Sequence, residues 1–251
     1  PRPIVKTFNG RTINSIINPK LSKGLKALSQ EQGGTLFMGL LATVNALLYR
    51  YTNQEDIIIG SPIAGREHID LEDQIGFYIN ILALRAKFKG EESYRELFNT
   101  IKEITFGAYE HQLHPFDELV DELNLQRDMS RGALFDVMVV LQNTHMNTKA
   151  ARHKLGGLNV TGYEDGESLI SKFDLTFNFE EIGEEIHTII EYNSDIYHKS
   201  TIEQLATHLE QLLGVIIVEP DSPINQLNYL SLEERQQLIV GFNDTAADYP
   251  K

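Results

Sequence analysis

The chain has 251 residues, of which 41% are hydrophobic and 23% are charged, enough for one large domain or two small ones with a buried core. Its formal net charge of −14 argues against nucleic acid or an anionic membrane as a partner, because both are bound by clustered lysine and arginine. The sequence contains no cysteine, which excludes disulfides and Cys-ligated zinc, and we expect a cytoplasmic protein.

The first six residues contain neither an initiator methionine nor the apolar stretch of a secretory signal. We therefore expect the chain to be a piece of a longer protein. Its most apolar run, residues 36–49, is interrupted by Gly39, Thr43 and Asn45 and is shorter than the roughly 20 residues that cross a bilayer. No membrane-spanning segment is predicted.

Two amphipathic helices are predicted near the start of the chain. Leu21, Leu25 and Leu28 have helical spacing, and the glycine pair at 33–34 should end that helix. Thr35 is suited to cap the next helix. Its apolar residues recur every three or four positions, at Leu36, Phe37, Leu40, Leu41, Val44, Leu47 and Leu48.

Three later helices are predicted from the Ser-x-x-Glu pattern, in which the serine and the glutamate satisfy each other's free backbone amides. The pattern begins at Ser93, Ser200 and Ser231. The first two helices carry apolar stripes wide enough to pack on a sheet, and the third should be short.

Runs of β-branched residues predict the strands. The last two runs flank residues 182–184 and predict a hairpin. Helices and strands together predict an α/β fold, a two-layer sandwich in which helices pack on a mixed β-sheet. The predicted strands are 57–59, 79–84, 137–141, 158–160, 175–179 and 186–190.

A search for self-contained chemistry finds little. His111 and His114 are three residues apart, but no third ligand is evident, and no metal site is predicted. The segment 60–66 (GSPIAGR) matches the Gly-x-Ser-x-Gly nucleophile elbow only loosely, and Walker-type or dinucleotide glycine loops are absent from the sequence. Serine hydrolase chemistry is therefore not expected.

Several loop segments nevertheless resemble a known family, the condensation domains of nonribosomal peptide synthetases. Residues 60–66 with 75–85 (IGFYINILALR) are similar to the family's fifth motif, 111–117 (HQLHPFD) to the sixth, and 127–134 (RDMSRGAL) to the seventh. The resemblance runs from about Pro1 to about Gln237. Departures from the motifs are mild and fall at Tyr78, Ile79, Ile81, Leu113 and His114.

One family motif, His-His-x-x-x-Asp-Gly, is absent from this sequence, since no two of its eight histidines are adjacent. The second histidine of that motif is the family's catalytic centre. The resemblance therefore implies that residues 1–237 are the C-terminal lobe of a two-lobed condensation domain with a chloramphenicol acetyltransferase-like fold, that 238–251 begin the linker toward an adenylation domain, and that no catalytic residue lies in this chain.

The resemblance also suggests residues that line the substrate tunnel between the lobes. Ser61 is expected near a pantetheine arm, or else as a turn-forming serine. Asn80 is expected to offer its amide to substrate, or else to bond the backbone as an ordinary strand-end asparagine.

Structural roles are the main expectation for six charged or polar motif residues and two histidines. We expect Arg66 and Arg85 to tie loops to carboxylates, and a local hydrogen-bonded turn of alternating charge at 127–131. His111 and His114 are expected at the surface, where carrier docking is the alternative. The predicted turn contains Arg127, Asp128, Ser130 and Arg131.

The partners implied are the N-terminal lobe of the same domain, peptidyl carrier domains and a downstream adenylation domain. No cofactor is expected to bind this chain directly, since the phosphopantetheine arms belong to the carriers.

The polar stretch after Leu141 is expected to contain a crossover that latches the two lobes. Two other functions stay open at this point: a self-contained acyltransferase, and a non-catalytic module that binds a carrier or another partner.

Overall fold

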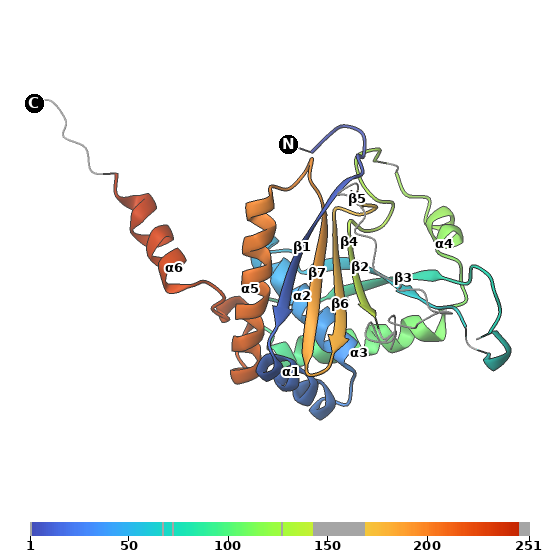
Figure 1. Ribbon diagram of the computed structural model, residues 1–251, viewed down its shortest axis with the longest axis horizontal. Helices are drawn as coiled ribbons and strands as arrows, with labels where there is room; N and C mark the ends of the chain where they lie inside the picture. The colour runs from blue at the N-terminus through green and yellow to red at the C-terminus, as the bar shows by residue number, and fades with distance from the viewer. Residues whose placement is uncertain (1, 67, 72, 127, 143–168, 246–251) are drawn as a thin grey trace, which may run out of the picture.

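The computed structural model describes residues 2–66, 68–71, 73–126, 128–142 and 169–245 (Figure 1). One mixed sheet of seven strands, in the order β3-β2-β4-β6-β7-β1-β5, forms the framework. The β2–β4 and β4–β6 pairs are parallel and the other pairs are antiparallel. The strands are β1 Asn9–Ile17, β2 Asp56–Ile63, β3 Asn80–Lys87, β4 Val137–Gln142, β5 Leu169–Ile170, β6 Leu175–Ile182 and β7 Glu185–Asn193.

Helices cover one face of this sheet, which confirms the predicted two-layer α/β sandwich (Figure 1). The apolar sides of α1, α2, α3 and α5 share one core with the sheet. Helix α4 lies apart from these helices, near the start of β3, and α6 lies beyond α5. The helices are α1 Pro19–Glu31, α2 Leu36–Thr52, α3 Tyr94–Glu110, α4 Phe116–Glu122, α5 Lys199–Val218 and α6 Leu232–Ile239.

Helix α2 is the centre of the core. Eleven of its residues are buried, and the sheet meets the helical layer with Val139, Phe177, Phe179 and Ile190, all of which are completely buried. Removing this much apolar surface from water is the main source of the fold's stability.

The predicted helix starts are confirmed in three of four cases. The Thr35 hydroxyl accepts a hydrogen bond from the Met38 amide at 3.3 Å, and both Ser93–Glu96 and Ser231–Glu234 form reciprocal capping boxes. The prediction at Ser200 was wrong, because α5 begins at Lys199 with His198 as its cap residue. Glu203 pairs with Lys199 at 3.4 Å instead of reaching back to Ser200.

The strand predictions also hold for the most part. The β6–β7 hairpin is confirmed, with Gly183 in the turn at a φ of 65°. Strand β1, with Ile13 and Ile17 directed at the core, was missed. The predicted strand 158–160 lies outside the described residues.

The opposite face of the sheet has its own small aromatic cluster. Phe135 is buried but lies outside the main core, and a Cβ added to Gly60 would overlap its ring. Phe116 and Phe173 pack on the same ring, with centroids 5.5 and 5.4 Å away. Glycine at position 60 is therefore required by close packing.

This close approach predicts that Gly60→Ala destabilises the protein by about 1–3 kcal/mol, the usual cost of overpacking. Gly107→Ala is the matched control, since its added Cβ would meet nothing within 4 Å and alanine in a helix interior is favoured by about 0.5–1 kcal/mol. Urea unfolding should show opposite shifts for the two variants. An unchanged midpoint for Gly60→Ala would contradict the packing described.

Candidate functional site

Ser61 lies in the second half of β2, where its backbone pairs with that of Leu82 on β3. The residue is 4% exposed and lines a small pocket of about 120 Å³. The pocket lies between the sheet and the ends of two helices. Its lining consists of Phe37, Pro62, Ile63, Leu82, Leu84, Tyr109 and Leu141 together with Ser61.

Asn80 begins β3 and binds the segment that joins α3 to α4. Its side-chain amide donates to the carbonyls of Gln112 and His114, at 2.9 and 2.8 Å. Its oxygen accepts from the amide of Phe116, at 3.1 Å. Both amide protons therefore go to backbone carbonyls, an arrangement that favours the backbone-bonding alternative for this residue.

The bond to Phe116 has a further effect, because α4 begins there. The cap residue of α4 is Pro115, which has no side chain that can accept a bond from the first amides. The Asn80 oxygen supplies this acceptor from another element of the chain. Asn80 thus joins the fifth-motif segment to the sixth-motif segment, a connection that the sequence pattern did not reveal.

Arg66 holds together the loop between β2 and β3. Its guanidinium donates to the carbonyls of Leu71 and Gly76 and lies over the Tyr78 ring, 4.5 Å from the centroid. Gly65 permits this fold with a φ of 63°. Arg66 therefore ties the loop through carbonyl oxygens and a ring.

Arg85 makes the carboxylate contact that was expected of it. Its guanidinium binds both oxygens of Asp56 on the neighbouring strand, at 2.8 and 2.7 Å. The hydrogen bond from Arg85 lowers the pKa of the Asp56 carboxyl. The pair is exposed and lies at the other end of β3 from Asn80, so it braces the β2–β3 edge.

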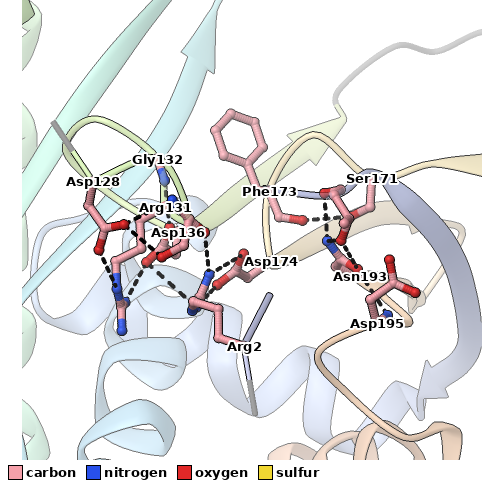
Figure 2. Close-up of polar contacts among 12 residues, drawn as sticks. Arg2, Asp128, Arg131, Gly132, Asp136, Ser171, Phe173, Asp174, Asn193 and Asp195 are labelled. Carbon is pink, nitrogen blue, oxygen red and sulfur yellow. Dashed lines mark hydrogen bonds and ion pairs between the residues drawn. The ribbon is translucent and has the colours of Figure 1, made fainter. Parts of the chain in front are cut away.

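The seventh-motif segment forms the local network that its charges suggested (Figure 2). Asp128 accepts from the amide and hydroxyl of Ser130, at 2.8 and 2.7 Å, and these bonds lower its pKa. Arg131 pairs with Asp136 at 2.8 Å. Arg127 lies outside the described residues.

Arg2 and Asp174 complete this network, and neither was predicted from the sequence (Figure 2). Arg2 donates to the Ser130 carbonyl at 3.0 Å and to both oxygens of Asp174, whose side chain is 1% exposed. The Asp174 amide in turn donates to the Asp136 carbonyl, at 2.9 Å. A single arginine 172 positions away from its partner gives no pattern that sequence inspection could detect.

A hollow of about 660 Å³ separates the seventh-motif segment from α4. Asp121 and Asn124 line it from α4 and its end, and Asp128, Met129 and Arg131 line it from the motif. The hollow is thus bordered by the seventh-motif segment and by α4 with the residues that follow it. Ser61 faces a separate pocket on the helical side of β2.

The two histidines of the sixth motif are at the surface. His111 ends α3, and His114 lies 3.9 Å from the Glu122 carboxylate. Among the described residues, no group of three or more His, Asp or Glu side chains is arranged to hold a metal ion. Within the same residues, no helix is long and apolar enough to cross a membrane.

Known proteins similar to this chain are large synthetases. A linear gramicidin synthase protein of Brevibacillus parabrevis is 44% identical over 252 residues, which cover 100% of this chain and 5% of the synthase. Tyrocidine synthase 3 of the same organism is 41% identical, over 100% of this chain and 4% of that protein. A plipastatin synthase protein of Bacillus subtilis is 42% identical, over 98% and 7%. The chain therefore spans only a small part of these relatives.

Solved structures share the fold at low sequence identity. A four-domain nonribosomal peptide synthetase, holo-AB3403, gives a TM-score of 0.82 at 21% identity, over 94% of this chain and 19% of that chain. The X-domain from teicoplanin biosynthesis gives 0.79 at 21% identity, over 92% and 52%. The first condensation domain of the CDA synthetase gives 0.70 at 18% identity, over 90% and 50%.

Residues 1–239 also match the family described as Condensation domain. This match covers nearly the whole chain and includes the three motif segments that Asn80 and the seventh-motif network hold in place. The chain belongs to the condensation-domain family of nonribosomal peptide synthetases.

Proposed function

We propose that this chain is the C-terminal half of a condensation domain that joins two carrier-bound building blocks through a peptide bond. One observation carries the proposal: the chain has the fifth, sixth and seventh motifs in order, in one connected structure, but no pair of adjacent histidines. In agreement with a half-domain, the chain corresponds to about half of two single-domain relatives, at 50% and 52% of their lengths.

In the proposed reaction, the acceptor amine attacks the carbonyl carbon of the donor thioester. The carbon–sulfur bond breaks, the thiol leaves, and the amine gives up a proton. Such a step needs the two reactants held in the right orientation and donors for the oxyanion that develops. We assign the catalytic histidine to the N-terminal lobe, so that this half supplies channel walls and no catalytic residue.

Within the half-domain, we assign Asn80 a positioning role and Ser61 a place on the channel wall near a pantetheine arm. Asn80 holds the sixth-motif segment and the start of α4, and with them one wall of the hollow near the seventh motif. The polar groups at 128–131 shape the opposite wall. One wall is therefore set by bonds between the fifth and sixth motifs, and the other by bonds within the seventh motif and from it to Asp136.

The N-terminal lobe is the first partner that we propose. The loop held by Arg66 displays apolar side chains that a free surface would not favour, among them Phe77, which is 87% exposed. Ile69, Ile75 and Ile79 on the same loop are also exposed. A second lobe of the same domain would cover them. The expected latch after Leu141 falls on residues outside the described ones.

The other proposed partners are two peptidyl carrier domains, with their phosphopantetheine arms, and a downstream adenylation domain, all in the cytoplasm. This assignment is supported by the similarity to a solved nonribosomal peptide synthetase of four domains. The proposed boundary between lobe and linker, after residue 237, falls within α6, and the family match ends at 239. The comparisons do not favour a self-contained acyltransferase or a separate binding module.

An assay with carrier proteins loaded with aminoacyl thioesters tests the proposal. The 251-residue chain alone should give no dipeptidyl product by mass spectrometry. This chain matches one segment of tyrocidine synthase 3. Product should form when the N-terminal half of the condensation domain that contains this segment is added as a separate polypeptide. That N-terminal half alone, and the same half with the second histidine of its motif changed to alanine, are the controls. Product from the chain alone would overturn the half-domain assignment.

The positioning role of Asn80 has its own test. Asn80→Ala removes three bonds to backbone groups, and we expect a loss of about 1–3 kcal/mol in unfolding free energy together with faster hydrogen exchange in residues 111–118. Asn80→Asp should cost more, because a carboxylate would face the carbonyls of Gln112 and His114. Asn14→Ala, on the exposed side of β1, is the control. Exchange that stays unchanged in both Asn80 variants would exclude this role.

A further inference from the structure

A polar network around one buried histidine joins three helices on the side of the molecule away from the motif loops. Its other two members reach the surface, since Tyr51 is 41% exposed and the Glu234 side chain is 25% exposed. His208 on α5 is 3% exposed. Its Nδ1 lies 2.6 Å from the hydroxyl of Tyr51, near the end of α2. Its Nε2 lies 2.9 Å from Oε1 of Glu234, in the first turn of α6. None of these three residues belongs to a condensation motif.

Protons can be assigned in this network from its chemistry. The Glu234 carboxylate accepts a bond from the Gln204 side chain at 2.8 Å and from the Ser231 amide at 2.9 Å, so it is held as an anion and only accepts. Nε2 of His208 must then carry the proton. Nδ1 is left with a lone pair, which accepts from the Tyr51 hydroxyl. All three side chains are satisfied with the histidine neutral.

Tyr229 packs against two members of the network. Tyr229 places its ring edge-on to His208, with centroids 4.9 Å apart, and stacks on Tyr51 at 6.1 Å. The guanidinium of Arg50 lies 5.2 Å from the Tyr229 ring centroid and donates to the Asn225 carbonyl. The segment that leads from α5 to α6 is thereby held against α2.

Helix α6 depends on this network for its position. It has eight residues, none of them buried, and a helix this short is marginal in water without tertiary contacts. Figure 1 shows it directed away from the sheet, beyond α5. The bonds of Glu234 to His208 and Gln204 connect its first turn to the lobe.

We propose that Tyr51, His208 and Glu234 form a lock that holds the first turn of α6 on the lobe and so fixes the direction in which the chain leaves it. The lock works through one carboxylate with two tasks. One oxygen of Glu234 accepts from the Ser231 amide within α6, and the other accepts from His208 on α5. The orientation of α6 on α5 and the capping of its first turn therefore depend on the same side chain. The proposal does not depend on peptide-bond formation.

The chain offers a matched control for this lock. The Ser93–Glu96 box at the start of α3 has the same reciprocal capping bonds, at 2.7 Å from the Ser93 amide and 3.3 Å to its hydroxyl, but Glu96 has no histidine partner among the described residues. Changing Glu96 to Gln therefore tests the cost of a weakened capping box alone. The difference between the two glutamates isolates the lock.

The first experiment is hydrogen exchange on the full chain, read at the amides of α6. Glu234→Gln and His208→Gln should speed exchange of the Arg235 and Val240 amides about tenfold, the usual value of a charge-assisted hydrogen bond. Tyr51→Phe should give a smaller acceleration. Amides of α5 report whether a variant remains folded. Glu96→Gln should speed exchange in the first turn of α3 by a smaller factor, which gives the cost of the weakened capping box alone.

The second experiment measures orientation directly. Since the chain has no cysteine, Lys23→Cys and Gln237→Cys can carry two spin labels, one on α1 and one on α6. Electron–electron resonance should give a narrow distance distribution in the parent and a broad one in Glu234→Gln. Tyr51→Phe removes a single oxygen atom and serves as the mildest variant. The lock would be overturned if Glu234→Gln and His208→Gln, both with native exchange in α5, kept the parent's distance distribution and the parent's exchange rates in α6.

The charge state of Glu234 gives a separate prediction. Its bonds, first of all the one from Gln204, lower its pKa from 4.5 to about 2. Because the bonded carboxyl has the lower pKa, its bonds stabilise the folded chain above pH 4.5, and this contribution is lost as the pH falls through about 2. The bonds from Gln204 and His208 depend on docking, whereas the Ser231 bond belongs to the capping box of α6 itself. The groups bonded to this carboxylate are Gln204, His208 and Ser231. Tyr51 lies behind the His208 ring as the nearest other titratable group of the network.

Nuclear magnetic resonance of the side-chain carboxyl carbon measures this pKa. The Glu234 signal should titrate at about 2, and Gln204→Ala should move its midpoint toward 4.5. A midpoint of 4.5 in the unchanged chain would show that the carboxylate is unbonded, and it would contradict the lock.

Discussion

Burial of one face of the sheet is the constraint on which the rest of this structure depends. Four helices take up the apolar side of the strands, with α2 at the centre, and this leaves the strand ends and the opposite face to other tasks. The motif segments use these places. Ser61 is at the end of a strand, and Asn80 is at the start of one. The core therefore positions residues that contribute little to it.

Polar bonds between distant segments provide the second level of organisation. Asn80 connects β3 to the segment before α4, and Arg2 connects the start of the chain to the seventh motif and to Asp174. Each bond is made to a backbone group or to a buried carboxylate, where a missing partner is costly. The geometry around the hollow at α4 is thus set by a few side chains, while the core supplies the stability.

The sequence predicted those contacts whose residues are close together in the chain, and it missed those whose residues are far apart in it. Capping at Thr35, Ser93 and Ser231 involves residues three positions apart, and the sequence pattern was sufficient. The same pattern failed at Ser200, because the cap residue is His198, two positions earlier, and Glu203 pairs with Lys199. Strand β1 was missed since only two of its residues, Ile13 and Ile17, face the core with large apolar side chains. The turn at 128–131 was predicted because it is local, whereas the Arg2–Asp174 pair spans the chain.

The position of Arg2 limits where such a unit can be divided. Its guanidinium neutralises a carboxylate that is almost completely buried, and the Lys6 amide adds a backbone bond to the Met129 carbonyl at 2.8 Å. A recombination event, or an engineered module exchange, that joined foreign sequence after residue 6 would remove the arginine that Asp174 binds. Breakpoints that keep residues 2–6 with the rest of this chain avoid this loss, so a module exchange should be joined upstream of that arginine.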